Sequence, residues 1–381
     1  MKRIKIKGLI ACIISLSLCG CWDKIEINDR GFAIGIGLDK IGEQLQVTYT
    51  IPNLPVITGQ GGSGEQKFVK ISEGKTIHEA NKRFNLMSSN KLTFDHTKII
   101  ILGKGFLQDE VEMRKALDYL SRSPDYALSL LVFTTDKTAQ EILEAKPNSD
   151  EPSSMFIDSM FSGTEAEELN DYKTTLLDFL ISLIDTKGGG SLPLLSYKDK
   201  EIRMEGITVI KDYIECCTLS LEQLIPYNWI RGSGGGKKTI KKEEYIGKNI
   251  TYQISQIRRN VEFKKSETKQ GLDINILLEM EGDIIEHELS KDKNEDEDFF
   301  DEKSIKEMEK ELKDGMEEEV NMLVKFIQAE VGVDVLDLSK DLKIKEGKLW
   351  EEIKDNWVEY FASANIHVEI VPNIRRIGMT K

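Results

Sequence analysis

The cysteines are the residues of this sequence whose type and spacing most clearly suggest chemistry. The chain has 381 residues, of which five are cysteines, at positions 12, 19, 21, 216 and 217. A thiol can form a disulfide, bind a metal ion or be alkylated, depending on its compartment and its neighbours. Cys216 and Cys217 are adjacent, so a bond between them would close a strained ring. We predict two free, mostly buried thiols there; a labile redox pair is the alternative.

The other three cysteines lie in or directly after a leader segment. Four basic residues at positions 2, 3, 5 and 7 precede an uncharged apolar stretch over residues 8–18. Eleven apolar residues rise only about 16 Å as a helix, about half of the hydrocarbon core of a bilayer. The pattern is typical of a signal peptide that is removed on export, and not of a permanent membrane span.

The end of this leader carries a modification motif. Leu18-Cys19-Gly20-Cys21 resembles the bacterial lipobox, in which the last cysteine receives a diacylglycerol and becomes the new N-terminus. We therefore predict a lipoprotein signal peptide over residues 1–20 and lipidation of Cys21, with fatty acids such as palmitate as the anchor. Two acyl chains are enough for stable attachment to a membrane. An ordinary secretory peptide with an incidental cysteine is the alternative.

The charge of the chain limits its partners. Removal of the leader takes away four positive charges and changes the formal net charge from −14 to −18. So acidic a protein lacks the basic face that nucleic acids require, and we expect no nucleic-acid partner. Anionic lipid headgroups also repel it, so the acyl anchor must provide the attachment to the membrane.

Two glycine-containing segments resemble phosphate-binding loops without the surroundings that such loops need. Residues 59–64 match G-x-G-x-x-G, but a proline-rich loop precedes them and a predicted strand follows. Dinucleotide binding needs a strand before the glycines and a helix after them. Gly74-Lys75-Thr76 resembles the end of a P-loop, but Val69 stands where its first glycine should be. We interpret residues 59–64 as a flexible loop and Thr76 as a helix cap.

The histidines and the acidic run do not form metal sites in the sequence. The four histidines, at positions 78, 96, 287 and 367, are far apart, and none has a second histidine or a cysteine at ligand spacing. We expect His96 to be packed and locally hydrogen-bonded instead of acting as a general base. The run at residues 290–302 begins like a calcium loop, but Glu297 and Lys303 replace its glycine and its bidentate glutamate. We predict no catalytic residue, metal or cofactor; the run should be a solvated acidic face, with weak calcium binding as the alternative.

Strands and helices interleave in the N-terminal half, which predicts one mixed sheet. Alternating apolar residues predict strands, and Thr-x-x-Glu capping boxes predict the starts of two helices. The expected strands are 31–39, 45–51, 67–71, 98–102 and 126–135; the expected helices are 76–87, 108–120, one that begins at 138, and 174–184. Glycine-rich segments at 187–191 and 232–236 predict two hinges.

The remaining sequence predicts a small unit between the hinges and an α+β unit after them. The expected strands are 202–210, 215–219, 249–263, 272–283 and 366–370, and the expected helices are 219–224, 304–330 and 348–361. Trp350, Ile353, Trp357 and Phe361 share one face of the last helix. We interpret this face as core, with a docking surface for a partner as the alternative.

Several blocks together resemble the Ger(x)C family of spore germination lipoproteins. The lipobox is followed by Cys21-Trp22-Asp23-x-x-Glu26-Ile27 and then by Gly35-Ile36-Gly37-Leu38-Asp39-Lys40. Further similar blocks are 74–80, 94–98, 206–211, the tryptophan helix 349–361 and the closing segment 368–378. The resemblance covers essentially the whole chain after the leader.

This resemblance implies an α+β fold of three domains, each a mixed or antiparallel β-sheet with flanking helices. With the hinges above, we expect domains at 21–186, 192–231 and 237–381. It also implies a function: the non-enzymatic C subunit of a germinant receptor, lipid-anchored on the outer face of the spore inner membrane beside integral-membrane A and B subunits. The alternative is an extracytoplasmic lipoprotein that captures a small ligand between its domains; we do not expect direct small-molecule binding.

Overall fold

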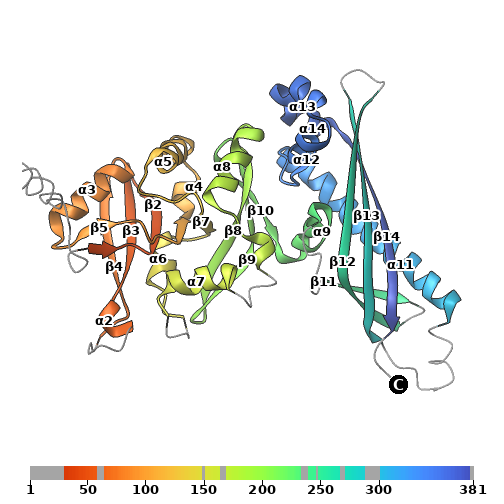
Figure 1. The fold of residues 1–381 in the computed structure, drawn as a ribbon, viewed down its shortest axis with the longest axis horizontal. Helices are drawn as coiled ribbons and strands as arrows, with labels where there is room; N and C mark the ends of the chain where they lie inside the picture. The colour runs from red at the N-terminus through yellow and green to blue at the C-terminus, as the bar shows by residue number, and fades with distance from the viewer. Residues whose placement is uncertain are drawn as a thin grey trace, which may run out of the picture.

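The computed structural model describes residues 30–57, 64–147, 151–163, 169–232, 239–245, 248–266, 271–287 and 301–377. The molecule is elongated, with a large sheet at one end and a smaller sheet at the other (Figure 1). Within the described residues, no helix is long and apolar enough to cross a membrane.

The large sheet has eight strands in the order β10-β9-β8-β7-β6-β2-β3-β4. The central strands β2, β6, β7 and β8 are parallel to one another, and the pairs at both ends are antiparallel. The strands are β2 (Gly35–Ile41), β3 (Gln44–Pro52), β4 (Lys67–Gly74), β6 (Ile99–Leu102), β7 (Leu131–Thr135), β8 (Gly190–Lys198), β9 (Glu201–Lys211) and β10 (Ile214–Ser220). This is the mixed sheet that the sequence predicts.

Helices cover both faces of this sheet. The buried strand β6 shows this directly, because Ile100 and Leu102 belong to one apolar core while Ile99 and Ile101 belong to the other. A strand buried on both faces is a continuous apolar run without alternation. The helices are α2 (Leu54–Ile57), α3 (Ile77–Met87), α4 (Lys104–Leu107), α5 (Glu110–Arg122), α6 (Ala139–Glu144), α7 (Ser153–Ser162) and α8 (Leu176–Asp185).

The helix starts agree with the capping signals in the sequence. Thr76 and Thr138 accept hydrogen bonds from the backbone N–H groups of Glu79 and Glu141, which confirms both as N-caps. A short two-stranded sheet of β1 (Arg30–Phe32) and β5 (Lys91–Thr93) lies beside this unit. The sequence does not predict helix α7, because the polar residues on either side of its ten residues obscure the helical pattern.

The expected hinge at residues 187–191 is wrong. Gly188, Gly189 and Gly190 are buried, and the Thr186 hydroxyl donates to the Gly189 carbonyl at 2.7 Å. A Cβ on Gly189 would lie 2.0 Å from Cγ1 of Val333, and Gly188 has a φ of +112°. The glycines therefore permit a positive φ and a close approach between chain segments, and do not provide flexibility.

A separate sheet for residues 192–231 is also wrong. Strand β8 pairs with β7, Thr134 opposite Leu194, and the Thr134 hydroxyl donates to the Pro193 carbonyl at 3.1 Å. Strands β8 to β10 therefore extend the N-terminal sheet. The division into three domains at 186/192 and 231/237 remains a prediction.

The smaller sheet has four strands in the order β11-β12-β13-β14, with β13 and β14 parallel. The strands are β11 (Thr239–Tyr245), β12 (Lys248–Lys265), β13 (Leu272–His287) and β14 (Asn365–Ile377). The long helix α11 (Glu302–Phe326) lies across the sheet (Figure 1). Its carboxylates at Glu317 and Glu309 accept from the backbone N–H groups of Ile370 and Ile374 at 3.0 and 2.9 Å. The edge strand β14 thus has its outward N–H groups partly satisfied.

Helix α9 (Leu221–Arg231) connects the two sheets, and short helices close one end of the smaller sheet: α12 (Leu338–Lys345), α13 (Gly347–Ile353) and α14 (Trp357–Ser363). The expected single helix 348–361 is interrupted by a 3₁₀ turn at Lys354–Asn356. Its apolar face is nevertheless core, because Trp350, Ile353, Trp357 and Phe361 are all buried.

Candidate functional site at the junction between the two sheets

Several residues singled out in the sequence lie outside the described part of the chain. These are the lipidation candidate Cys21, residues 59–63 of the glycine-rich loop, residues 233–236 of the second expected hinge and residues 290–300 of the acidic run. Lipidation of Cys21 therefore remains a prediction.

The adjacent cysteines are both free, as expected, but they are less buried than expected. Cys216 is exposed and Cys217 is half-buried, and the pairing of β10 with β9 shifts register between Glu215 and Cys217. Burial, with Cys216 beside it, raises the pKa of the Cys217 thiol to about 12. A thiol that stays protonated is a poor nucleophile and a poor metal ligand, so burial disfavours reactions at Cys217.

The other sequence candidates do not meet in a catalytic site. His96 is exposed, and its ring lies edge-on to Phe32 at 5.3 Å, so the expectation of a packed residue is only partly right. Val69 lies within strand β4, so residues 69–76 form a strand and a helix start. Among the described residues, no group of three or more His, Cys, Asp or Glu side chains is placed to hold a metal ion.

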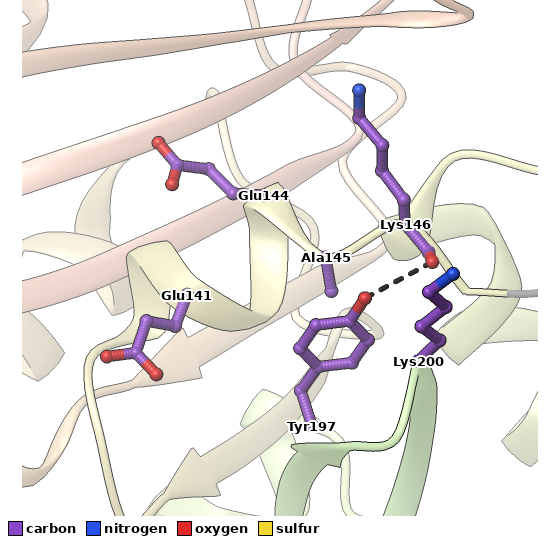
Figure 2. Close-up of a pocket in the computed structure, with 6 residues that line it drawn as sticks. All are labelled: Glu141, Glu144, Ala145, Lys146, Tyr197 and Lys200. Carbon is purple, nitrogen blue, oxygen red and sulfur yellow. Dashed lines mark hydrogen bonds between the residues drawn. The ribbon is translucent and has the colours of Figure 1, made fainter.

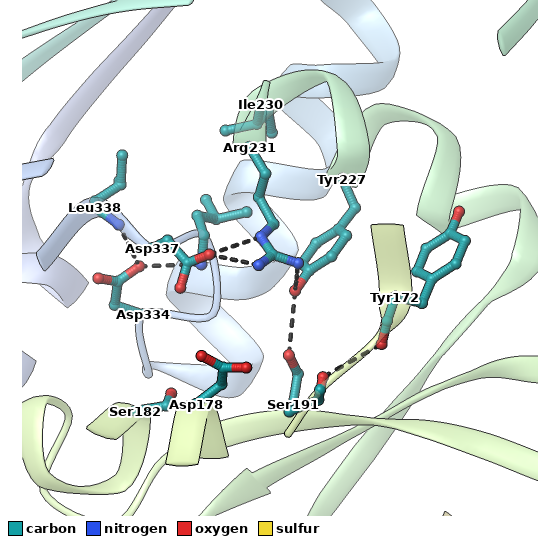
Figure 3. A network of polar contacts seen from close by, with 12 residues as sticks. Tyr172, Asp178, Ser182, Ser191, Tyr227, Ile230, Arg231, Asp334, Asp337 and Leu338 are labelled. Carbon is teal, nitrogen blue, oxygen red and sulfur yellow. Dashed lines mark hydrogen bonds and ion pairs between the residues drawn. The ribbon is translucent and has the colours of Figure 1, made fainter. Parts of the chain in front are cut away.

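A network of polar side chains lies where the two sheets meet. Arg231 ends helix α9, and its guanidinium donates to Oδ2 of Asp337 from Nε at 2.9 Å and from Nη2 at 2.5 Å. It also donates to the hydroxyl of Tyr227 at 3.3 Å, and that hydroxyl lies 3.2 Å from the hydroxyl of Ser191 in β8 (Figure 3). One guanidinium therefore links the smaller sheet's helical cap to the large sheet.

The partners of Arg231 in this network raise its pKa. Burial opposes the charge of Arg231, but Tyr227 and Asp337 outweigh it and raise the pKa of the guanidinium. Asp337 has a φ of +60°, a conformation uncommon for residues other than glycine. Strained backbone of this kind tends to persist where the surrounding structure requires a side chain in one place. Here it places a carboxylate opposite Arg231.

Further polar contacts cross the same junction. Arg259 of β12 pairs with Asp341 at 2.6 Å and also donates to the carbonyl of Ile230, and Lys343 pairs with Asp185 at the end of α8. The junction also contains an apolar part, because Trp229 and Ile230 belong to the core that continues into the smaller sheet. The relative orientation of the two sheets is therefore fixed by directional, charge-assisted bonds as well as by packing.

A second polar centre lies under the hollow beside α6. The Lys67 ammonium is buried and donates to the carbonyls of Leu143 and Ala145 and to the hydroxyl of Ser153, at 2.5, 2.6 and 2.7 Å. It thus satisfies the carbonyls at the C-terminal end of α6, where the helix dipole favours a cation. Burial lowers the pKa of this ammonium to about 8.

The hollow above this centre has a volume of about 710 Å³. It is lined by Glu141, Glu144, Ala145, Lys146, Tyr197 and Lys200 (Figure 2). Four of these six side chains are charged.

Replacing Lys67 by methionine is expected to lower the free energy of unfolding by about 2 kcal/mol. The methionine fills similar space but leaves the buried carbonyl of Ala145 without its donor, while the Ser153 hydroxyl still donates to the carbonyl of Leu143. Thermal or urea unfolding measures the change. The matched control is Lys70→Met on the same strand, because Lys70 is exposed and its loss should change stability by no more than about 0.5 kcal/mol. Equal stabilities for the two variants would contradict a structural role for Lys67.

The block Gly35–Lys40 has a clear packing role. A Cβ on Gly35 would lie 2.6 Å from Cβ of Ser154, and one on Gly37 would lie 2.9 Å from Cβ of Ala139, so glycines let α6 and α7 approach β2 closely. The buried carboxylate of Asp39 accepts from the backbone N–H groups of Ala139 and Gln140, at 2.8 and 3.0 Å. It therefore binds the N-terminus of α6.

Comparison with known proteins identifies the family to which this chain belongs. A profile of the spore germination protein N-terminal domain matches residues 23–197, and a profile of the spore germination B3/GerAC-like C-terminal region matches residues 205–378. The chain belongs to the Ger(x)C family of spore germination proteins. The sequence resemblance is thereby confirmed.

Several relatives of this Ger(x)C protein align over nearly their whole length. Spore germination protein YndF of Bacillus subtilis is 24% identical, with 100% of this chain and 98% of the relative covered. Spore germination protein B3 of the same organism is 24% identical over 95% of each chain. The crystal structure of the GerBC protein matches with a TM-score of 0.57 at 17% identity, covering 92% of this chain and 99% of that one. This likeness confirms the α+β fold with sheets flanked by helices.

Sequence reasoning missed Arg231, Asp337 and Lys67. Each is a single polar residue whose partner lies more than 70 positions away in the chain, so no local spacing marks it. The only signal available was Lys67 itself, a charged residue at the start of a predicted strand.

Proposed function

We propose that this chain is the lipid-anchored C subunit of a nutrient germinant receptor. In this proposal it has no enzymatic activity, lies on the outer face of the spore inner membrane, and assembles with integral-membrane A and B subunits to trigger germination. Its part in the receptor is to couple nutrient sensing to ion release, through a soluble body that acyl chains attach to the membrane.

The observation that carries the proposal is the order and extent of the two family matches. The N-terminal match begins at residue 23, two positions after Cys21, and the C-terminal match ends at residue 378. The chain therefore has both parts of a family member, placed directly after the lipobox-like segment that ends at Cys21. Its matched relatives are named as spore germination proteins, among them A3 and B3 of Bacillus subtilis.

The anchor is tested by Cys21→Ala. The thiol of Cys21 is the proposed acylation site, so the variant should not incorporate labelled palmitate, should leave the spore membrane fraction or stay uncleaved, and should abolish nutrient germination. The matched control is Cys19→Ala. That change keeps the Leu-x-Gly-Cys pattern and should leave labelling, fractionation and germination as they are.

Normal membrane attachment and normal germination of the Cys21→Ala variant would overturn the proposed anchor. The assembly is tested separately, by purifying the tagged chain from spore membranes in mild detergent. Co-purification of the A and B subunits at a constant ratio is the expected result. Their absence from a purified, acylated chain would contradict the subunit role while leaving the anchor intact.

A further inference from the structure

An exposed apolar pair stands at the C-terminal end of helix α3. The side chains of Leu86 and Met87 are adjacent, and the two residues are 79% and 73% exposed. We call this pair the apolar tip. A single exposed apolar residue is ordinary, but two neighbours that are both about three-quarters exposed are not buried against any part of the chain that the structure describes.

The apolar tip is held on ordered backbone. Asn85, just before it, accepts a hydrogen bond from the backbone N–H of Leu92 at 2.9 Å. The hydroxyl of Ser88, just after it, accepts from the backbone N–H of Asn90 at 3.2 Å. These bonds close the segment between α3 and β5 into a defined turn, so the two side chains are presented to the outside at a fixed place.

The tip lies where the N-terminal segment enters the fold. Strand β5 follows the tip and pairs with β1, Lys91 opposite Arg30, and a Cβ on Gly31 would lie 3.7 Å from Cβ of Asn90. Only eight residues separate Cys21 from Arg30. Even fully extended, that stretch reaches only about 30 Å. Arg30 must therefore stay within that distance of a membrane that holds acyl chains on Cys21, and the tip is joined to the strand that pairs with Arg30.

Basic residues flank the tip in the sequence of an acidic chain. Lys82, Arg83 and Lys91 surround the pair in sequence and are all exposed, while the chain carries a net charge of −14. Arg83 pairs with Glu79 at 2.6 Å, which leaves Lys82 and Lys91 as the cations beside the tip for which no ion pair is described. Exposed apolar side chains next to lysines are the combination that binds to an anionic lipid surface.

We propose that the apolar tip inserts into the lipid surface next to the anchor, with Lys82 and Lys91 over anionic headgroups. The inference rests on the proposed lipidation of Cys21, which brings this end of the molecule to the membrane. The tip and the acyl chains are then two membrane contacts, and together they restrict the orientation of the folded protein relative to the membrane. Because α3 and β5 lie at the end of the molecule far from the smaller sheet (Figure 1), that sheet is held away from the lipid.

Vesicle binding of the non-acylated chain tests the tip without the anchor. The protein is the processed chain, residues 21–381, with Cys21→Ala. It keeps every buried residue of both apolar cores, which lie between Ala33 and Ile370. Sedimentation with sucrose-loaded vesicles of phosphatidylcholine and phosphatidylglycerol at millimolar lipid gives the partition coefficient. We expect weak binding that falls further when phosphatidylglycerol is left out or salt is added.

The decisive variant is Leu86→Ser with Met87→Ser, and the matched control is Met322→Ser with Ile344→Ser. The control residues are 57% and 76% exposed and lie on α11 and α12. The tip variant should bind anionic vesicles about tenfold less than its parent, because two apolar side chains no longer leave water. The control should stay within about twofold, and both variants should keep the parent's melting temperature.

Three results would overturn the proposal: no vesicle binding by the parent chain, equal binding by tip variant and parent, or equal losses in tip variant and control. Unchanged vesicle binding with lost co-purification of the A and B subunits would assign the tip to a protein partner and overturn the lipid contact. The assay contains neither acyl chains nor other subunits. Its failure is therefore distinct from a failure of the Cys21→Ala test.

Discussion

Replacing Trp357 by alanine is expected to lower the free energy of unfolding by about 3 to 5 kcal/mol, the cost of removing a fully buried aromatic side chain. Trp357 begins helix α14 and has no exposed surface. Its ring meets that of Trp350 edge-on at 5.8 Å and lies 6.1 Å from that of Phe361. Alanine would leave a cavity bordered by both rings, and a domain of ordinary stability could unfold outright.

Thermal unfolding of the chain without residues 1–21 measures this loss. Val358→Ala is the matched control, because Val358 is the next residue of α14 but only half-buried, and it should cost no more than about 1 kcal/mol. Trp357→Phe should cost less than the alanine change, since it keeps a ring and removes an indole N–H for which no hydrogen-bond partner is described. An unchanged melting temperature for Trp357→Ala, with loss of a partner, would make this face a docking surface.

The face around Trp357 shows what the sequence can predict. Residues spaced by three and four positions must share one side of a helix, so Trp350, Ile353, Trp357 and Phe361 were assigned to the core from spacing alone. The 3₁₀ turn at Lys354–Asn356 interrupts the helix without moving these side chains out of the core. The spacing of the apolar residues therefore predicted these core positions correctly, although the predicted single helix is interrupted.

Glycines were the main source of error. The run Lys187–Ser191 has the composition of a linker, but its glycines are buried, Gly189 against Val333, and the run continues into β8. Composition cannot distinguish a glycine that gives freedom from one that gives room for a neighbour, because the neighbour lies almost 150 residues away. For the same reason, the sequence did not predict β8, and the strands of one sheet were assigned to two domains.

The junction was beyond prediction for a related reason. The contacts of Arg231 with Asp337 and of Lys343 with Asp185 join residues more than 100 positions apart. Their partners follow from the packing of two sheets, and that packing is encoded in many apolar residues together. The family resemblance gave the function class, and only the structure shows how the two sheets are joined.

The carboxylate of Asp334 stabilises the segment of this junction that carries Asp337. It is buried, and it accepts hydrogen bonds from the backbone N–H groups of Leu336, Leu338 and Ser339, at 3.0, 3.2 and 2.7 Å (Figure 3 shows the bond from Leu338). These bonds shape the segment that carries Asp337 toward Arg231. Burial raises the pKa of Asp334 to about 6, although the N–H donors act in the opposite direction.

This pKa predicts a decrease in stability as the pH rises. An unfolded aspartate titrates near its ordinary value of 3.8, so between about pH 4 and pH 6 the folded chain holds a proton that the unfolded chain has lost. The folded state binds more protons in this window, and the free energy of unfolding must fall with increasing pH. The stabilisation is complete below about pH 3.8 and is lost as the pH rises through 6; a shift of this size corresponds to about 3 kcal/mol.

Asp334→Asn isolates this effect, because asparagine stays neutral and every other titrating group is retained. Urea unfolding of both chains between pH 4 and 8 gives the stability difference, native chain minus variant. We expect that difference to fall by up to about 3 kcal/mol as the pH rises, most steeply near pH 5, midway between the two pKa values, whatever constant cost the amide causes by losing an acceptor. Parallel profiles would mean that folding does not shift the pKa of Asp334. A difference that grows with pH would mean that the three N–H donors outweigh burial, and the loop carrying Asp337 would then be strengthened by ionisation.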